Sequence, residues 1–130
     1  MSKINISADN LGKEIANTIA AYTKEVSEAV EAEVDRTAKE VRDEIKNTAP
    51  ERTGEYAKGF TVKKDNSAGK SNRIIYNRKK PGLVHLLELG HVKRGGKGRV
   101  AAKPHLQPSY DKIVPKFERN VEKIIKNGGK

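Results

Sequence analysis

Apolar residues recur every three or four positions from Leu11 to Ile45, which is the spacing of one face of an α-helix. Polar residues that favour helix caps precede this stretch, and Pro50 follows it. The pattern predicts one long amphipathic helix over residues 9–48, preceded by an N-terminal extension over residues 1–8. At 1.5 Å per residue the helix would be roughly 57 Å long, which is longer than a domain of this size is wide. We therefore expect part of it to project, bend or pack on another subunit.

The pattern changes to that of β-structure after the helix, and residues 55–105 form a predicted β-rich region. Phe60 and Val62 alternate with polar neighbours, and residues 73–77 are β-branched and aromatic. A polar stretch that contains a glycine separates the two. These residues predict a β-hairpin over residues 59–77.

Two more helical stripes follow the hairpin. Three leucines fit the apolar side of a short helix: Leu83, Leu86 and Leu87. Gly90 can end this helix in a left-handed conformation. A second stripe with a period of 3.6 residues predicts a C-terminal helix over residues 108–127, with Pro115 as a local kink off the apolar face.

The order of elements predicts a single domain over residues 1–130 of the α+β class. Its long N-terminal helix and its C-terminal helix should pack on a small antiparallel β-sheet, with one short helix between strands. Ile, Leu, Val and Phe together make up 28 of the 130 residues, which is little for a highly charged chain. We therefore expect a modest monomer that is completed by partners in a larger assembly.

Charge is distributed unevenly along the chain, whose formal net charge is +10. Residues 1–48 carry a net charge of −3 and residues 49–130 a net charge of +13. The segment over residues 91–103 holds five cations and no acid, and it is predicted to be a flexible basic loop between two short strand-like pieces: Lys93, Arg94, Lys97, Arg99 and Lys103. Such a loop suits an acidic assembly partner or, without sequence specificity, the phosphates of DNA. Composition leaves both interpretations open.

The chain offers little for catalysis or cofactor binding. It has no cysteine, and the spacing of its three histidines, His85, His91 and His105, fits no zinc site. Glu88 and Asp65 are the only acids between Glu55 and Asp111, too few for a two-metal nuclease. No nucleophile or phosphate-binding motif is present. We predict no catalytic residue, no metal, no cofactor and no enzyme activity.

The remaining composition bears on membranes and nucleic acids. No apolar run reaches the roughly 18 residues of a membrane span, and the first ten residues lack the pattern of a signal peptide. We therefore expect no membrane contact and synthesis in a cytoplasm. The absence of tryptophan and the scarcity of other aromatic residues argue against a stacking platform for single-stranded nucleic acid.

Three short motifs follow one another along the chain. A proline followed by Thr-Gly ends the long helix, at Pro50, Thr53 and Gly54. An apolar-Glu-apolar-Gly element ends the short helix, at Leu87, Glu88, Leu89 and Gly90. A segment between two prolines precedes the last helix, at Pro104, His105, Leu106, Gln107 and Pro108. In this order the motifs resemble those of the small neck proteins of long-tailed bacteriophages, described as head-tail joining, tail-completion or minor tail proteins. That family commonly has an aromatic residue where Leu89 and His105 stand and a basic one at Gln107.

The resemblance implies a structural protein of a phage or prophage neck that joins head and tail during virion assembly. It implies a homo-oligomeric ring in the virion, with connector and tail-terminator proteins as partners, made in the cytoplasm of a bacterial host. The alternative from composition is a small basic protein that binds nucleic acid without specificity. Contact with DNA is possible under either hypothesis.

Overall fold

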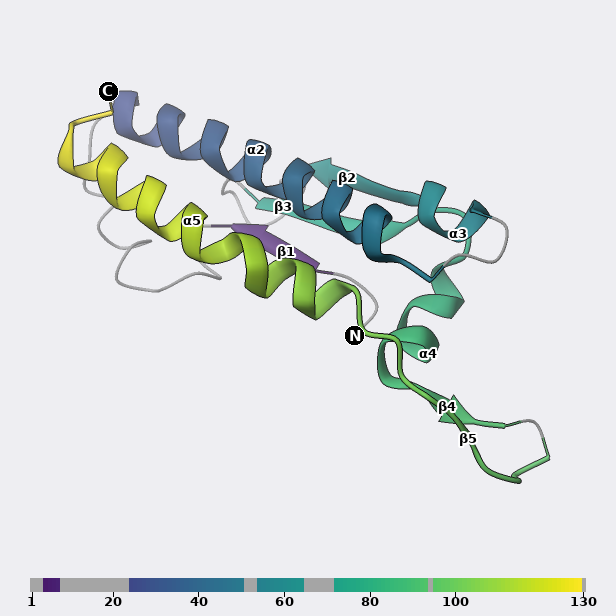
Figure 1. Ribbon diagram of the computed structural model, residues 1–130. Coiled ribbons are helices and arrows are strands. Elements are labelled where there is room, and N and C mark those ends of the chain that lie inside the picture. The colour runs from purple at the N-terminus through teal and green to yellow at the C-terminus, as the bar shows by residue number, and fades with distance from the viewer. Residues whose placement is uncertain (1–3, 8–23, 51–53, 65–71, 94, 130) are drawn as a thin grey trace.

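The protein is a two-layer α+β domain, with two long helices on one face of a three-stranded sheet (Figure 1). The computed structural model describes residues 4–7, 24–50, 54–64, 72–93 and 95–129. The elements are, in order, β1 (Ile4–Ser7), α2 (Lys24–Thr48), α3 (Glu55–Lys58), β2 (Phe60–Lys64), β3 (Asn72–Asn77), the 3-10 helix η2 (Pro81–Leu83), α4 (Val84–Leu89), β4 (His91–Val92), β5 (Arg99–Val100) and α5 (Leu106–Lys126). This arrangement confirms the predicted fold class.

The apolar stripe of α2 is the centre of the core. Six residues of the stripe are at most 3% exposed: Val26, Val30, Val34, Ala38, Val41 and Ile45. They pack with apolar side chains of α5 and the sheet. The helix and α5 run in opposite directions, side by side (Figure 1). The predicted helix over residues 9–48 is confirmed from Lys24 onward, and its first part lies outside the described residues.

The sheet has the strand order β1-β3-β2 and is antiparallel throughout. The predicted hairpin is confirmed, with Val62 opposite Ile75. The prediction of an N-terminal extension over residues 1–8 is wrong for Ile4–Ser7, which form an edge strand with Ile4 opposite Ile75. A strand of four residues is too short for a local pattern to identify it. Its pairing also depends on β3, which lies far along the chain.

The short helix differs from its prediction in the face that it buries. Val84 and Glu88 are buried, whereas Leu83 belongs to η2 and is 38% exposed. Gly90 has a positive φ of 75°, as predicted, but its ψ of 174° is extended, so it does not form a left-handed helix cap. A β-carbon at Gly90 would lie 2.7 Å from the carbonyl oxygen of Val100, which excludes any larger residue.

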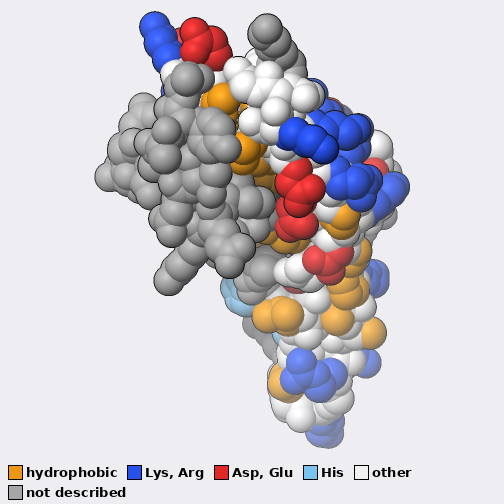
Figure 2. All heavy atoms as spheres, turned by 90° about the vertical axis from the view of Figure 1, so that its left-hand side faces the viewer, with side chains coloured by type: hydrophobic (Ala, Val, Ile, Leu, Met, Phe, Trp, Pro, Cys, Tyr) orange, Lys and Arg blue, Asp and Glu red, His pale blue; other side chains and the backbone are white. Residues whose placement is uncertain are grey.

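Residues 91–103, which we call the arm, project from the rest of the domain (Figure 1). The two short strands lie within this segment and pair with each other, His91 opposite Val100 and Val92 opposite Arg99. Beyond them the Lys93 N–H donates to the Gly98 carbonyl at 2.9 Å, and the Gly96 N–H donates to the Lys93 carbonyl at 2.9 Å. The predicted basic loop is therefore a hairpin. Figure 2 shows Lys and Arg side chains on this lower projection.

The C-terminal helix α5 begins at Leu106, two residues before the predicted start, and ends at Lys126. It continues through Pro115, whose side chain is exposed on the side away from the core. Its buried face includes Ile113, Phe117 and Val121.

Replacing Phe117 with Ala should leave a cavity in the core between the helices and the sheet, because the side chain is 1% exposed. The free energy of unfolding should fall by about 3–5 kcal/mol. Val92 is the matched control, since its side chain is 54% exposed, and Val92→Ala should change that free energy by less than about 0.5 kcal/mol. Denaturant titration measures both, and equal losses would contradict the placement of Phe117 in the core.

Candidate functional site

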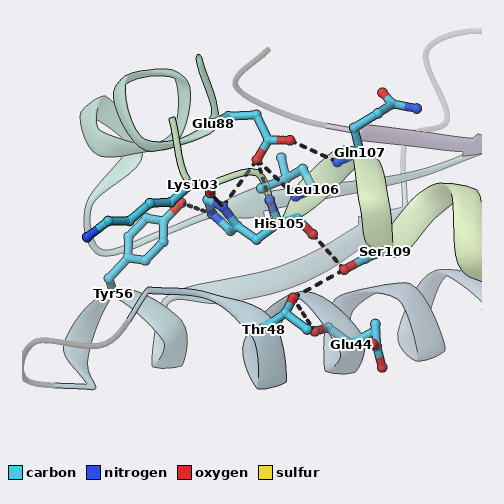
Figure 3. Close-up of polar contacts among 9 residues, drawn as sticks. All are labelled: Glu44, Thr48, Tyr56, Glu88, Lys103, His105, Leu106, Gln107 and Ser109. Atoms are coloured by element: carbon cyan, nitrogen blue, oxygen red, sulfur yellow. Dashed lines mark hydrogen bonds and ion pairs between the residues drawn. The ribbon is translucent and has the colours of Figure 1, made fainter. Parts of the chain in front are cut away.

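A buried carboxylate on α4 holds the first turn of α5 (Figure 3). Oε1 of Glu88 accepts hydrogen bonds from the backbone N–H groups of His105, at 2.8 Å, and Leu106, at 3.0 Å. Its Oε2 accepts one from the Gln107 N–H at 3.0 Å. His105, the residue at the N-cap position, makes no side-chain cap hydrogen bond, so a residue 17 positions earlier in the chain satisfies these donors.

The charge of Glu88 fits this position. Burial by itself raises the pKa of the carboxyl group, but the three backbone N–H groups and His105 outweigh it, and the pKa of Glu88 is lowered from its ordinary value. The positive end of the α5 helix dipole favours the same ionised form. Glu88 is therefore a carboxylate at neutral pH, although it is only 5% exposed to solvent.

His105 lies beside Glu88 and is fully buried, although in the sequence it borders the basic segment. Its Nδ1 is 2.8 Å from the Lys103 carbonyl oxygen and 3.1 Å from Oε1 of Glu88. Both neighbours can only accept, so Nδ1 carries a hydrogen. In the neutral ring Nε2 then accepts from the Tyr56 hydroxyl at 2.6 Å.

Tyr56 brings the α3 region into the same cluster. Burial raises the pKa of its hydroxyl, and the negative charge of Glu88 adds to this effect. The hydroxyl therefore stays protonated and donates a hydrogen bond to His105. The rings of Tyr56 and Phe60 meet the imidazole edge to face, with centroids 5.5 and 5.9 Å away. The imidazole thus packs as an aromatic ring among the side chains of the core.

We call Tyr56, Glu88 and His105 the clamp. A further chain of hydrogen bonds joins the clamp to α2: the hydroxyl of Ser109 donates to the His105 carbonyl at 2.6 Å and lies 3.4 Å from the Thr48 hydroxyl (Figure 3). The polar groups of the clamp have partners within the chain. Its chemistry is therefore that of a structural junction, which fixes α3, α4 and α5 to one another.

The clamp brings together the three motifs found in the sequence. Gly54, with φ of 79°, directly precedes α3, which carries Tyr56. Glu88 lies in the last turn of α4, and Leu106 is fully buried in the first turn of α5. The other motif residues that the structure describes flank these: Pro50 after α2, Gly90 after α4, and Pro104 and Pro108 on either side of the α5 start. Thr53 lies outside the described residues. Sequence reasoning missed Tyr56 and the role of His105.

A shallow groove of about 350 Å³ lies on the outer side of the clamp. Its wall joins the end of α4 to the first turns of α5, and the surface that it exposes is mostly apolar. The lining residues are Glu88, Leu89, Pro104, Gln107, Pro108 and Asp111. On its rim the Gln107 side chain donates to Asp111 at 2.8 Å. Leu89 is 60% exposed beside it.

The arm carries the predicted cations on its surface. Lys93, Lys97, Arg99 and Lys103 are exposed, and within the described part of the chain none of them forms an ion pair. Arg94 lies outside the described residues. The structure thus leaves a positively charged projection whose counter-charges are not supplied by the described part of its own chain.

In the part of the chain that the structure describes, no group of three His, Cys, Asp or Glu side chains could hold a metal ion. Among those residues, too, no helix combines the length and the apolar character that crossing a bilayer requires.

The Glu88→Gln variant keeps the shape of the clamp but removes its charge and presents an amide to N–H donors. At pH 7 its free energy of unfolding should be lower by about 1–3 kcal/mol. Because the folded-state pKa of Glu88 is lowered, the carboxylate stabilises fully above about pH 5, and this stabilisation is lost as the pH falls through the folded-state pKa. The free energies of unfolding of the two proteins, measured by denaturation from neutral to acidic pH, should therefore converge in acid.

Glu122→Gln, at an exposed position of α5, is the control. A gap between the Glu88 curves that stays constant down to the lowest pH would contradict the role of its charge.

The Tyr56→Phe variant leaves Nε2 of His105 without its donor in a buried site. We expect a loss of about 1–2 kcal/mol in the free energy of unfolding. Tyr76→Phe is the matched control, since Tyr76 is half-buried on β3 and its ring contacts Lys63. Thermal or chemical denaturation compares the two, and an equal or larger loss for the Tyr76 variant would contradict the clamp.

Residues 13–90, more than half of the chain, match the model of a family described as "Bacteriophage HK97-gp10, putative tail-component". The matched segment includes Tyr56, Glu88 and Gly90 and ends where the arm begins. Comparison with curated proteins and with solved structures gives no match. The family match confirms the resemblance to phage neck and tail proteins, and the chain belongs to the HK97-gp10-like family of bacteriophage tail components.

Proposed function

We propose that this protein is a non-enzymatic component of the phage neck that joins head and tail during assembly of the virion. Membership of a tail-component family supports a structural role in the particle. The observation that carries the finer proposal is the arm, a projection with exposed cations attached to a clamped junction. Such a projection suits contact with a neighbouring subunit or partner across a joint.

A ring of identical subunits around the neck agrees with this role. The monomer is small and its core is made largely of valine, isoleucine and alanine side chains, so contacts with neighbours would add to its stability. Connector and tail-terminator proteins are the partners that the proposal assigns on either side. The chain would then reside in the virion after synthesis in the bacterial host.

The test is to change the five arm cations, including Arg94, to Gln in the phage or prophage that encodes the protein. Joined particles should fall sharply in electron micrographs, with free heads and tails in their place, while circular dichroism shows that the isolated variant is folded. A control variant changes an equal number of exposed cations elsewhere, and it should assemble normally: Arg78, Lys80, Arg119, Lys123 and Lys126.

The same variant tests the nucleic-acid alternative. If the arm binds DNA, the original protein should bind duplex with a steep salt dependence, and the slope should shrink by about one for each phosphate-contacting cation removed. Normal joining of heads and tails together with lost duplex binding would overturn the assembly role of the arm and favour that alternative.

A further inference from the structure

The root of the arm combines apolar exposure with nearby positive charge. Leu89 comes directly before Gly90 and Val92 two residues after it, and their side chains are 60% and 54% exposed. The groove of about 350 Å³ opens beside Leu89, between Pro104 and Pro108. Figure 2 shows hydrophobic side chains along the projecting part, with cations among and below them.

The acidic groups of the same chain are largely engaged elsewhere. Carboxylates of α2 pair with cations of α5 and the sheet, for example Glu44 with Lys112 at 2.9 Å and Asp35 with Arg73 at 3.0 Å. Other described carboxylates also have partners within the chain: Glu28, Glu31, Glu33, Glu40, Asp43, Glu55 and Glu88. Within the described part of the chain most carboxylates are therefore already paired, so a second copy has few there to offer to the arm.

We propose that the groove and the arm together bind an acidic surface segment of a different phage protein. An apolar side chain of that segment fills the groove against Leu89 and Pro108, and carboxylates on either side of it pair with cations of the arm. The volume suits one or two side chains rather than a whole helix. This inference rests on the proposed function and adds the chemistry of the partner.

A protein fits these features better than DNA does. Phosphates would satisfy Lys93, Lys97 and Arg99, but a nucleic-acid backbone carries no aliphatic group to pack against the leucine and the two prolines of the groove wall. Interfaces gain affinity where an apolar anchor enters a pocket, and charged groups at the rim add steering and register. The groove is the anchor site and the arm supplies the charged rim.

The clamp gives the two parts a fixed relation. Glu88 forms part of the groove wall and also holds the backbone of residues 105–107. The Lys103 N–H donates to the Leu87 carbonyl at 2.7 Å, so the returning strand of the arm is attached to α4 as well. Binding therefore requires little ordering at the root.

The experiment places a photoreactive amino acid at Gln107, on the groove rim, in the protein expressed with its own phage. Irradiated particles should give a cross-link to a different neck or tail protein, at a peptide with an apolar residue between carboxylates. The same amino acid at Glu122, exposed further along α5, is the control and should give no such product. Adding Leu89→Ser, or changing Lys93, Lys97 and Arg99 to Gln, should reduce the yield roughly tenfold.

Four results would overturn the inference: a cross-link from Gln107 to a second copy of this chain, one to DNA, one to a peptide without carboxylates, or none in particles that contain the protein. The proposed function is judged separately, by deleting the gene and counting joined particles. Loss of joining with a cross-link to a second copy would leave the function standing and remove the acidic partner. Normal joining together with a cross-link to an acidic tail protein would leave the acidic partner standing and remove the joining function.

Discussion

The three hydrogen bonds to the Glu88 carboxylate are the interaction on which the arrangement of this domain depends. The first turn of a helix presents N–H groups that the helix cannot satisfy, and α5 has no side-chain cap at its own N-cap residue. A charged acceptor from α4 fills that role. Because His105 in turn binds Tyr56, one carboxylate fixes the last helix, the short helix and the α3 region together.

Many acids of the first half of the chain form ion pairs with cations of the second half inside the domain. Acids of α2 lie opposite cations of later elements, as in the pairs Asp35 with Arg73 and Glu40 with Lys116. Pairs that are exposed to solvent contribute little to stability. Their larger effect is on where the excess charge remains, because cations that find partners in the body leave the net positive charge concentrated on the arm and other exposed positions.

The elements that follow from periodicity could be predicted, and the clamp could not. The buried stripes of α2 and α5 are local patterns, and the structure confirms them together with the pairing of β2 and β3. The clamp joins residues 17 and 49 positions apart in the chain, and no pattern within a window links them. In the sequence His105 only borders the basic segment, and nothing in that position indicates that it is buried. The Glu at the end of a short apolar helix, followed by Gly90, was the available signal.

The returning end of the arm is attached to the domain, because the Lys103 N–H donates to the Leu87 carbonyl and the His105 N–H that follows donates to Glu88. Among the described residues of its tip, by contrast, the backbone hydrogen bonds join residues of the arm to one another. The length of the tip and the attachment of the arm to the domain therefore depend on different hydrogen bonds. Insertions or deletions at the tip can alter how far the arm extends without disturbing the core, so the turn between β4 and β5 is the position where related chains can diverge in length while keeping the same body.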